Sequence, residues 1–290
     1  MYPPLWARLL RLYGQQFPVL RGKSRLVRWV YHRLPKLTRP INTHIAGGLQ
    51  MELWPWLWAD FCMYMMNSPE AYHLRYFKSR IFNQAVVFDI GAYLGVYALT
   101  ASRIALEGSV HTFEPDPRSA RRLARAIEDN GLQNVHLCQC AVAEKQGEFR
   151  LALQDYPPQS LLQAPLLSHQ FPDEHVKTIS VSVRTVDEYC GAKGIRNVNL
   201  IKIDVEGAEL LVLRGASNTI AASRPELMVE LHEKQSQSFG YSVQDTINHL
   251  HMLKYEIFYI VPGITKSHLA PFNYKVSTNR AREIIIAHPT

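Results

Sequence analysis

The residues best suited to chemistry stand together in "LIKIDVEGAELLVLRGA", residues 200–216. A buried parallel strand is almost uniformly apolar, yet Lys202 and Asp204 interrupt this one and, being two apart, share a face. Glu206 follows them directly. A buried ion pair before a helix is the structural alternative, but such pairs stabilise a fold weakly. We therefore interpret the segment as part of a functional site at the end of a strand.

A second polar pair ends the segment "VELHE", where Glu230 and His232 share one face of an expected strand. Together with Asp204 they form a set of two carboxylates and one imidazole. Such a set can hold a general base, or it can bind a divalent metal through oxygen and nitrogen ligands. Asp204 and Glu230 are the candidate metal ligands.

A glycine-bearing turn follows the apolar run of "VVFDIGAYLG", residues 86–95. The run ends in Asp89, and Gly91 can adopt a positive φ or let a ligand approach the backbone closely. Gly95 opens a helix, whose free N–H groups favour a carboxylate or phosphate. The dinucleotide fingerprint GxGxxG is absent because Tyr97 occupies its third glycine position. Two glycines alone also fit an ordinary strand–helix turn.

An acid at the end of the next expected strand makes the turn more informative. Glu114, in "TFEPDP", stands 23 residues after Gly91, where an acid can accept hydrogen bonds from the ribose hydroxyls of a nucleoside. Asp116 is better placed than Glu114 to cap the following helix. We therefore predict that Glu114 binds a ribose.

Strands and helices alternate from about residue 85, which predicts an α/β fold with a mostly parallel sheet and helices on both faces. The strands are expected at 86–90, 110–114, 135–140, 198–203, 226–231, 256–261 and 284–287. In such a sheet, ligands bind at the carboxyl ends of the strands, near the topological switch point.

Residues 141–197 interrupt this alternation and are expected to form an insertion. Strands are expected there at 148–153 and 178–183, separated by the Pro- and Gln-rich segment 154–177, which has little periodicity. Long loops of this type inside a compact domain are often functional. The insertion is a candidate substrate flap.

The positive charge is confined to the N-terminus. Residues 1–50 contain nine Arg or Lys and no acid, so the rest of the chain is slightly acidic although the total is +7. This distribution argues against a nucleic-acid-binding catalytic domain. We predict a basic, partly helical extension at 1–69 and a catalytic domain at 70–290. Residues 1–40 could dock on that domain, contact an anionic membrane or act as a transit segment.

No run of 18 apolar residues occurs, and the nearest candidate for a membrane span, Leu53 to Met66, is too short and contains Asp60. The four cysteines show no metal-binding spacing, which indicates free thiols in a reducing compartment. The expected location is cytoplasmic, with peripheral membrane contact as the alternative.

The motifs, taken in order, resemble those of the FkbM-type S-adenosylmethionine-dependent methyltransferases. The segments that carry the resemblance are "VVFDIGAYLG", "FEPDP", "VSVRTVDEY", "LIKIDVEGAELLVLRGA" and "PELMVELHE". The resemblance covers roughly three quarters of the chain. It implies a class I methyltransferase (Rossmann-like) fold with seven strands, the last antiparallel. It also implies methyl transfer from S-adenosylmethionine to a hydroxyl of a sugar, glycan, lipid-linked or natural-product acceptor.

Carried over by motif, the resemblance implies cofactor contacts at Asp89, Gly91, Ala92, Gly95, Glu114 and Ala141. Ala141 would border the adenine and Glu114 the ribose. The family commonly has asparagine where this chain has Tyr93. The Tyr93 backbone can still serve the loop, while its ring packs beside the cofactor or caps the pocket.

The resemblance also places Lys202, Asp204, Glu206, Glu230 and His232 near the methyl group and the acceptor. His232 suits a general base by its near-neutral pKa, whereas Asp204 or Glu230 could orient it or bind Mg²⁺. Lys202 could orient Asp204, or serve as the base if burial lowers its pKa. These alternatives stay open at this point.

Three other classes of protein share some of these features. A nicotinamide-dependent oxidoreductase also uses an acid on the ribose, but the missing GxGxxG argues against it. An RNA or DNA methyltransferase would explain the basic N-terminus, but the strand end IDVE differs from the [DN]-PP-[YF] used for amino-group methylation. A non-catalytic scaffold at a membrane surface is the third alternative.

Overall fold

The computed structural model describes most of the chain, namely residues 5–16, 23–33, 38–45, 48–67, 70–152, 178–261, 268–272 and 283–290. Of the substrate flap expected at 141–197, segment 154–177 lies outside the described residues, whereas 141–152 and 178–197 are described.

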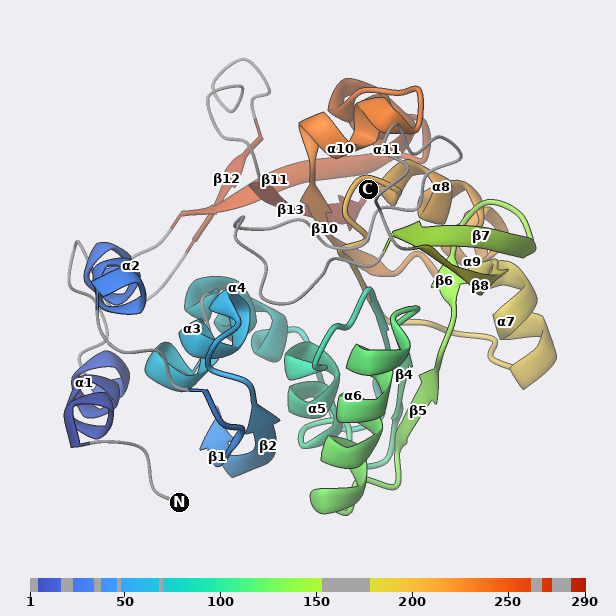
Figure 1. Cartoon of the computed structure of the whole chain (residues 1–290). Helices are drawn as coiled ribbons and strands as arrows, with labels where there is room; N and C mark the ends of the chain where they lie inside the picture. Colours follow the sequence, from blue (N-terminus) through green and yellow to red (C-terminus); the bar gives the residue numbers. More distant parts are fainter. Residues whose placement is uncertain are drawn as a thin grey trace.

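A central sheet organises the molecule (Figure 1). Its strands, in chain order, are β3 (Val86–Ile90), β4 (Ser109–Phe113), β5 (Val135–Cys138), β9 (Leu200–Ile203), β10 (Glu226–Leu231), β11 (Tyr255–Val261), β12 (His268–Pro271) and β13 (Glu283–Pro289). Their spatial order is β12-β11-β13-β10-β9-β3-β4-β5. The expected strands are therefore present.

The sheet is parallel from β5 to β10, and β13 runs antiparallel to both of its neighbours. This is the α/β arrangement of a class I methyltransferase, with its last strand reversed. The expected number of seven strands is corrected to eight in the described part of the sheet, because β12 pairs with the outer edge of β11.

Helices pack on both faces of the sheet because its strands are buried on both sides. Along each strand, neighbouring residues enter different core clusters: Val87 belongs to one and Phe88 to the other. The same alternation separates Leu200 from Ile201. Nearly continuous apolar strands are typical of a parallel sheet covered on both faces.

Helices α1 to α6 contribute to one cluster, and helices α7, α8, α9 and α11 to the other. The first group is α1 (Leu5–Gln16), α2 (Lys23–Arg33), α3 (Trp58–Met66), α4 (Ala71–Ser79), α5 (Val96–Ser102) and α6 (Pro117–Asp129). The second is α7 (Val186–Lys193), α8 (Glu209–Arg214), α9 (Ser217–Ser223) and α11 (Val243–Met252), with α10 (Glu233–Ser238) after β10. Lys202 and Asp204 project on the side of the first group, since they share a face with Leu200.

The N-terminal segment shares its core with the catalytic domain. The hairpin β1 (Ile41–Ile45) and β2 (Leu49–Leu53) joins α6 through Asn130, whose side chain bonds both backbone groups of Gln50. Helix α1 packs on α3 so closely that a Cβ at Gly14 would lie 2.1 Å from the carbonyl oxygen of Met65. Helix α1 thus packs against α3, within the predicted extension 1–69, and the alternatives for residues 1–40 stay predictions.

A smaller sheet of β6 (Ala141–Val142), β8 (Thr178–Arg184) and β7 (Gly147–Ala152) stands beside the main one. It contains the two strands expected in the insertion. None of the described helices is both long and apolar enough to cross a bilayer.

Candidate active site

The site lies where the strand order reverses, between β3 and β9. These strands run parallel, and Asp89 of β3 is the register partner of Lys202 of β9. The ammonium Nζ of Lys202 lies 3.3 Å from Oδ2 of Asp204 and 3.6 Å from Oδ1 of Asp89. The switch point of the sheet therefore joins the two sequence motifs through one buried lysine.

Lys202 keeps its proton in this environment. Burial alone would lower the pKa of its amine, but the carboxylates of Asp204, Asp89 and Glu70 raise it above its ordinary value. The ring of Tyr97, 4.9 Å from Nζ, adds a cation–π contact. A lysine acting as a base needs the opposite shift of its pKa, so this arrangement does not favour Lys202 as the base. Its geometry fits the alternative role of orienting Asp204.

The glycine turn fits tightly against the end of β9. Gly91 has φ +81°, and a Cβ there would lie 1.8 Å from the carbonyl oxygen of Asp204. The N–H groups of Gly91 and Ala92 both donate to the carbonyl of Phe113 at the end of β4. Gly95 begins α5 with φ +76°. Gly91 is thus needed because two strand ends meet there.

Asp89 anchors the helix that follows the turn. It is fully buried, and its Oδ2 accepts a hydrogen bond of 3.0 Å from the backbone N–H of Ala98 in α5. Burial raises the pKa of Asp89, while Lys202 acts in the opposite direction. Asp89 therefore connects the start of α5 to β3, the strand that it belongs to.

Glu114 joins β4 to the glycine turn. Its Oε2 accepts 2.7 Å from the N–H of Tyr93, and its Oε1 accepts 2.9 Å from the N–H of Asp116. Burial raises the pKa of this carboxyl group to about 7. Each carboxylate oxygen has a second lone pair, so hydrogen bonds from ribose hydroxyls are compatible with these contacts.

Tyr93 turns its side chain toward the N-terminal segment. It has φ +52°, and its hydroxyl donates 2.7 Å to Oδ1 of Asp60 in α3. Asp60 is fully buried, accepts 2.6 Å from the N–H of Trp54, and forms an ion pair with Arg122 of α6. The Tyr93 backbone serves the loop as expected, while its phenol joins a network that the sequence did not reveal. A charged residue inside an apolar run was the available signal for Asp60.

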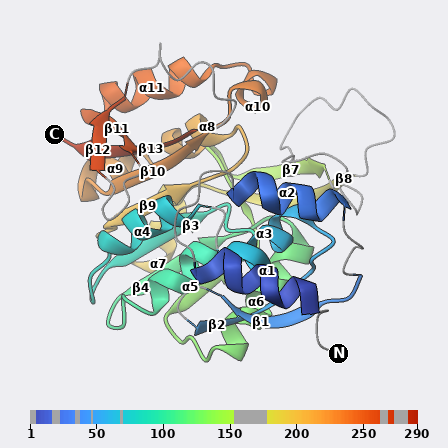
Figure 2. The ribbon, with the colours of Figure 1, turned by 90° about the vertical axis from the view of Figure 1, so that its left-hand side faces the viewer.

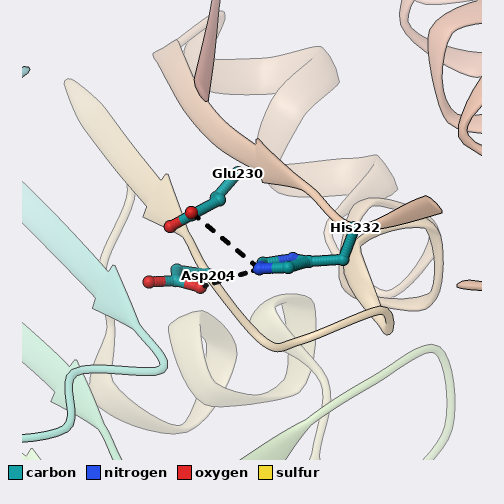
Figure 3. A group of neighbouring side chains, drawn as sticks. All are labelled: Asp204, Glu230 and His232. Carbon is teal, nitrogen blue, oxygen red and sulfur yellow. Dashed lines mark ion pairs between the residues drawn. The ribbon is translucent and has the colours of Figure 1, made fainter. Parts of the chain in front are cut away.

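Asp204, Glu230 and His232 converge beyond the ends of β9 and β10 (Figure 3). Nε2 of His232 lies 4.0 Å from Oδ1 of Asp204 and 3.9 Å from Oε1 of Glu230. Glu206 is also near, with its Oε2 3.3 Å from the same nitrogen. The structure thus brings together the acids and the imidazole that the sequence indicated.

Glu209 contacts the nitrogen of the His232 ring that points away from Asp204 and Glu230. Nδ1 of His232 lies 3.0 Å from Oε1 of Glu209, which also accepts 2.9 Å from the N–H of Gly207. Glu209 is not among the residues that the sequence predicted for the site. Its place in the block "KIDVEGAE", three residues after Glu206, was the signal that could have identified it.

These carboxylates change the protonation of His232. Burial would lower its pKa, but the hydrogen bond to Glu209 and the charge of Glu206 raise it to about 9. The expected near-neutral pKa is therefore wrong for this arrangement, because the sequence did not show how many carboxylates surround the ring. At neutral pH, His232 is a cation that organises the acids.

Ala141 is placed differently from the other expected cofactor residues. The strand expected at 135–140 ends at Cys138, and Ala141 opens β6, where it pairs with Val183 of β8. It packs in the small core of the second sheet. Its adenine role stays a prediction.

The chain is similar to one protein family and to several individual methyltransferases. The model of the methyltransferase FkbM domain matches residues 89–257, more than half of the chain. The 2-O-methyltransferase NoeI of Sinorhizobium fredii is 28% identical over 149 residues, which cover 48% of this chain and 60% of NoeI. The 31-O-demethyl-FK506 methyltransferase FkbM of Streptomyces tacrolimicus is 27% identical over 175 residues, 51% of this chain and 65% of that protein.

The hexuronic acid methyltransferase AglP of Haloferax volcanii is 27% identical over 149 residues, 51% of this chain and 56% of AglP. The chain thus spans about 60% of the length of the curated relatives it matches. The family match includes the glycine turn, Glu114 and the ends of β9 and β10. The chain belongs to the FkbM methyltransferase domain family, and its cofactor is S-adenosylmethionine.

Proposed function

We propose that the protein is an S-adenosylmethionine-dependent O-methyltransferase that acts on a hydroxyl of a sugar, glycan or natural product. The observation that carries this proposal is the convergence of Asp204, Glu230 and His232 beside the glycine turn. The relatives support the acceptor class, since two are named for methylation of an oxygen and a third for a hexuronic acid.

The residues of the site fit the cofactor. Glu114 offers a buried carboxylate to the ribose, and the Gly91 backbone lies at the strand ends without a side chain in the way. The carboxylates of Asp204 and Glu230 at the ends of β9 and β10 attract a positively charged ligand. When bound, S-adenosylmethionine supplies a methyl group that its sulfonium charge already activates.

The chain's own residues must position the acceptor and accept its proton. A hydroxyl is a weak nucleophile, so a base within hydrogen-bond reach speeds the transfer by about 10²–10⁴-fold. Among the converging residues, Asp204 has the most exposed side chain, 18% against 2% for His232. Asp204 is therefore the group that an acceptor hydroxyl reaches first, while Lys202 and His232 hold it in place.

A methyl-transfer assay tests this function. The protein is incubated with S-adenosylmethionine and a panel of sugar, glycan, lipid-linked and natural-product alcohols, and methyl ethers are detected by mass spectrometry. We expect a methyl ether with at least one class and a thermal shift with S-adenosylhomocysteine. A thermal shift without any methylated alcohol would contradict the acceptor class, and no thermal shift would contradict the cofactor site.

We propose in addition that the N-terminal helices contact an anionic membrane. Leu5, Leu9 and Leu12 form an exposed stripe at i, i+4 and i+7 on α1, and Trp29 is exposed on α2. Both helices lie on the same side of the molecule, toward the viewer in Figure 2. This surface lies in a segment that contains no acid before Glu52. Apolar side chains among arginines are typical of helices at an anionic lipid surface.

Vesicle flotation tests the membrane contact. The wild type should float with vesicles of phosphatidylglycerol and phosphatidylcholine and less with phosphatidylcholine alone. Leu9→Glu should reduce flotation several-fold. Leu106→Glu is the matched control, because Leu106 is also highly exposed but lies between α5 and β4. Equal flotation of both variants would argue against a contact through α1.

A further inference from the structure

Five carboxylates and two cations of the described residues gather at the switch point. The carboxylates are those of Asp89, Asp204, Glu206, Glu209 and Glu230, and the cations are Lys202 and His232. Apart from Asp204, all of these residues are buried. Buried carboxylates this close together favour a bound cation.

The donor atoms of three of these residues face one another. Oxygens of Asp204 and Glu230 and a ring nitrogen of His232 all lie within 4.8 Å of one another, and no ion is present at this candidate site. The two distances from Nε2, 3.9 and 4.0 Å, exceed a hydrogen bond. Two ligands of one tetrahedral ion, each about 2.0–2.2 Å from it, lie about 3.3–3.6 Å apart. The side chains therefore need to approach one another by a few tenths of an ångström when an ion binds.

The imidazole provides a second, independent observation. His232 is 2% exposed, and its Nε2 has no hydrogen-bond partner among the described residues. Its other nitrogen contacts Glu209, a carboxylate. Metal-binding histidines usually direct the second nitrogen to a carboxylate or carbonyl in this way, which fixes the ring. Figure 3 shows the ring directed edge-on toward both acids.

We propose that Asp204, Glu230 and His232 bind one divalent ion of the first transition row. One nitrogen and two carboxylate oxygens suit Mn²⁺, Fe²⁺ or Zn²⁺ better than the oxygen-only sets typical of Ca²⁺. The ion takes the place of the proton on Nε2. Glu206, whose Oε2 is 3.3 Å from that nitrogen, is near enough to become a fourth ligand.

The ion has a role in the reaction that rests on the proposed function. Its position beyond the ends of β9 and β10 is where the proposed acceptor meets Asp204. A hydroxyl oxygen bound there loses its proton more easily, because a metal stabilises the alkoxide charge. With a metal ion in this role, the reaction does not need His232 as a base, which is consistent with the acids that surround its ring.

Binding of Mn²⁺ tests the site without any assay of methyl transfer. The full chain is treated with EDTA, dialysed and titrated with Mn²⁺, and free Mn²⁺ is followed by electron paramagnetic resonance. We expect one ion per chain, and binding weakened about tenfold or more in Glu230→Gln and His232→Asn. Glu226→Gln is the matched control, because it is a buried acid at the other end of β10 that lies near His288.

Two further measurements separate the possible failures. Circular dichroism melting curves confirm that each variant is folded. Calorimetry with S-adenosylhomocysteine reports on the cofactor site independently of the metal. If the wild type binds cofactor but no Mn²⁺ at about millimolar concentration, or if Glu230→Gln binds Mn²⁺ as the wild type does, the metal site is overturned while the proposed methyltransferase stands.

Discussion

The carboxyl ends of β3 and β4 and those of β9 and β10 form two halves of one edge of the sheet, and the acids in the two halves have different partners. At β3 and β4, the carboxylates of Asp89 and Glu114 accept hydrogen bonds from backbone N–H groups. At β9 and β10, Asp204 and Glu230 lie instead near the cationic side chains of Lys202 and His232. The acids of the first half are therefore held mainly by backbone groups, with Asp89 also 3.6 Å from Lys202, and those of the second half by charged side chains.

This difference indicates that the β3–β4 acids serve cofactor binding and the β9–β10 acids serve the reaction. Acids bonded to the backbone hold the glycine turn in one shape, which suits recognition of a cofactor. Acids balanced by side-chain cations can exchange protons or metal ions with little change in the backbone. We therefore expect variants in the β3–β4 half to change cofactor affinity, and variants in the β9–β10 half to change turnover.

The largest effect is expected for Asp204→Ala. Removing the carboxylate nearest the acceptor should lower kcat by about 10²-fold or more, because general-base or metal-assisted catalysis contributes that much. Steady-state kinetics with a detected acceptor measures it. S-adenosylhomocysteine affinity, measured in parallel, should change by less than about threefold. Full turnover in this variant would remove Asp204 from the chemistry.

The next effect is on the fold at the glycine turn. Gly91→Ala should lower the free energy of unfolding by about 2–4 kcal/mol, since the new Cβ meets the Asp204 backbone and φ is positive. Urea denaturation measures it. Gly131→Ala is the control: it has φ +61° and nothing within 4 Å, so it should lose only about 1 kcal/mol. Equal losses would show that the close approach is unimportant.

The edge where the strands meet could be predicted from the sequence because parallel strands place their carboxyl ends together. Asp89, Glu114, Asp204 and Glu230 all lie where the pattern indicated. The pairing with Asp60 could not be predicted, since it joins residues 33 positions apart in a contact outside the strand pattern. The protonation of His232 could not be predicted either, because it depends on its distances to Glu206 and Glu209, which follow the neighbouring strand β9.

The limits of β5 show a different kind of error. The apolar pattern continues to Cys140, but the chain leaves the main sheet at Cys138 and pairs with β8 from Ala141. A strand that continues in the main sheet and a strand that moves to the second sheet bury the same alternating residues. The hydrophobic pattern therefore does not distinguish the two. A change of sheet is decided by the partner strand β8, which lies about 40 residues further along the chain, after segment 154–177.

A smaller effect is expected from pH on cofactor affinity. Burial raises the pKa of Glu114 to about 7, with Asp116 and Asp89 as neighbouring acids. The ionised form accepts hydrogen bonds better, so affinity for S-adenosylhomocysteine should rise as the pH increases through 7. The gain between pH 6 and 8 should be at most about tenfold, which is the change in the ionised fraction. In Glu114→Gln this rise should be absent when measured by calorimetry.

The smallest effect is expected for Tyr93→Phe. The variant removes the hydrogen bond to Asp60, whose other contacts with Arg122 and Trp54 remain. The free energy of unfolding should fall by about 1 kcal/mol, with at most a threefold loss of cofactor affinity. Thermal unfolding and calorimetry measure the two changes. Loss of all cofactor binding would mean that the phenol itself contacts the ligand.

Calorimetry of S-adenosylhomocysteine binding to Glu114→Gln and Glu230→Gln, compared at pH 8 with the wild type, tests the central claim most directly. Both substitutions replace a buried carboxylate at a strand end by an amide of the same shape. If the β3–β4 half binds the cofactor and the β9–β10 half carries the chemistry, Glu114→Gln should bind S-adenosylhomocysteine about tenfold more weakly. Glu230→Gln should bind it with wild-type affinity. The reverse pattern, or an equal loss in both, would contradict it.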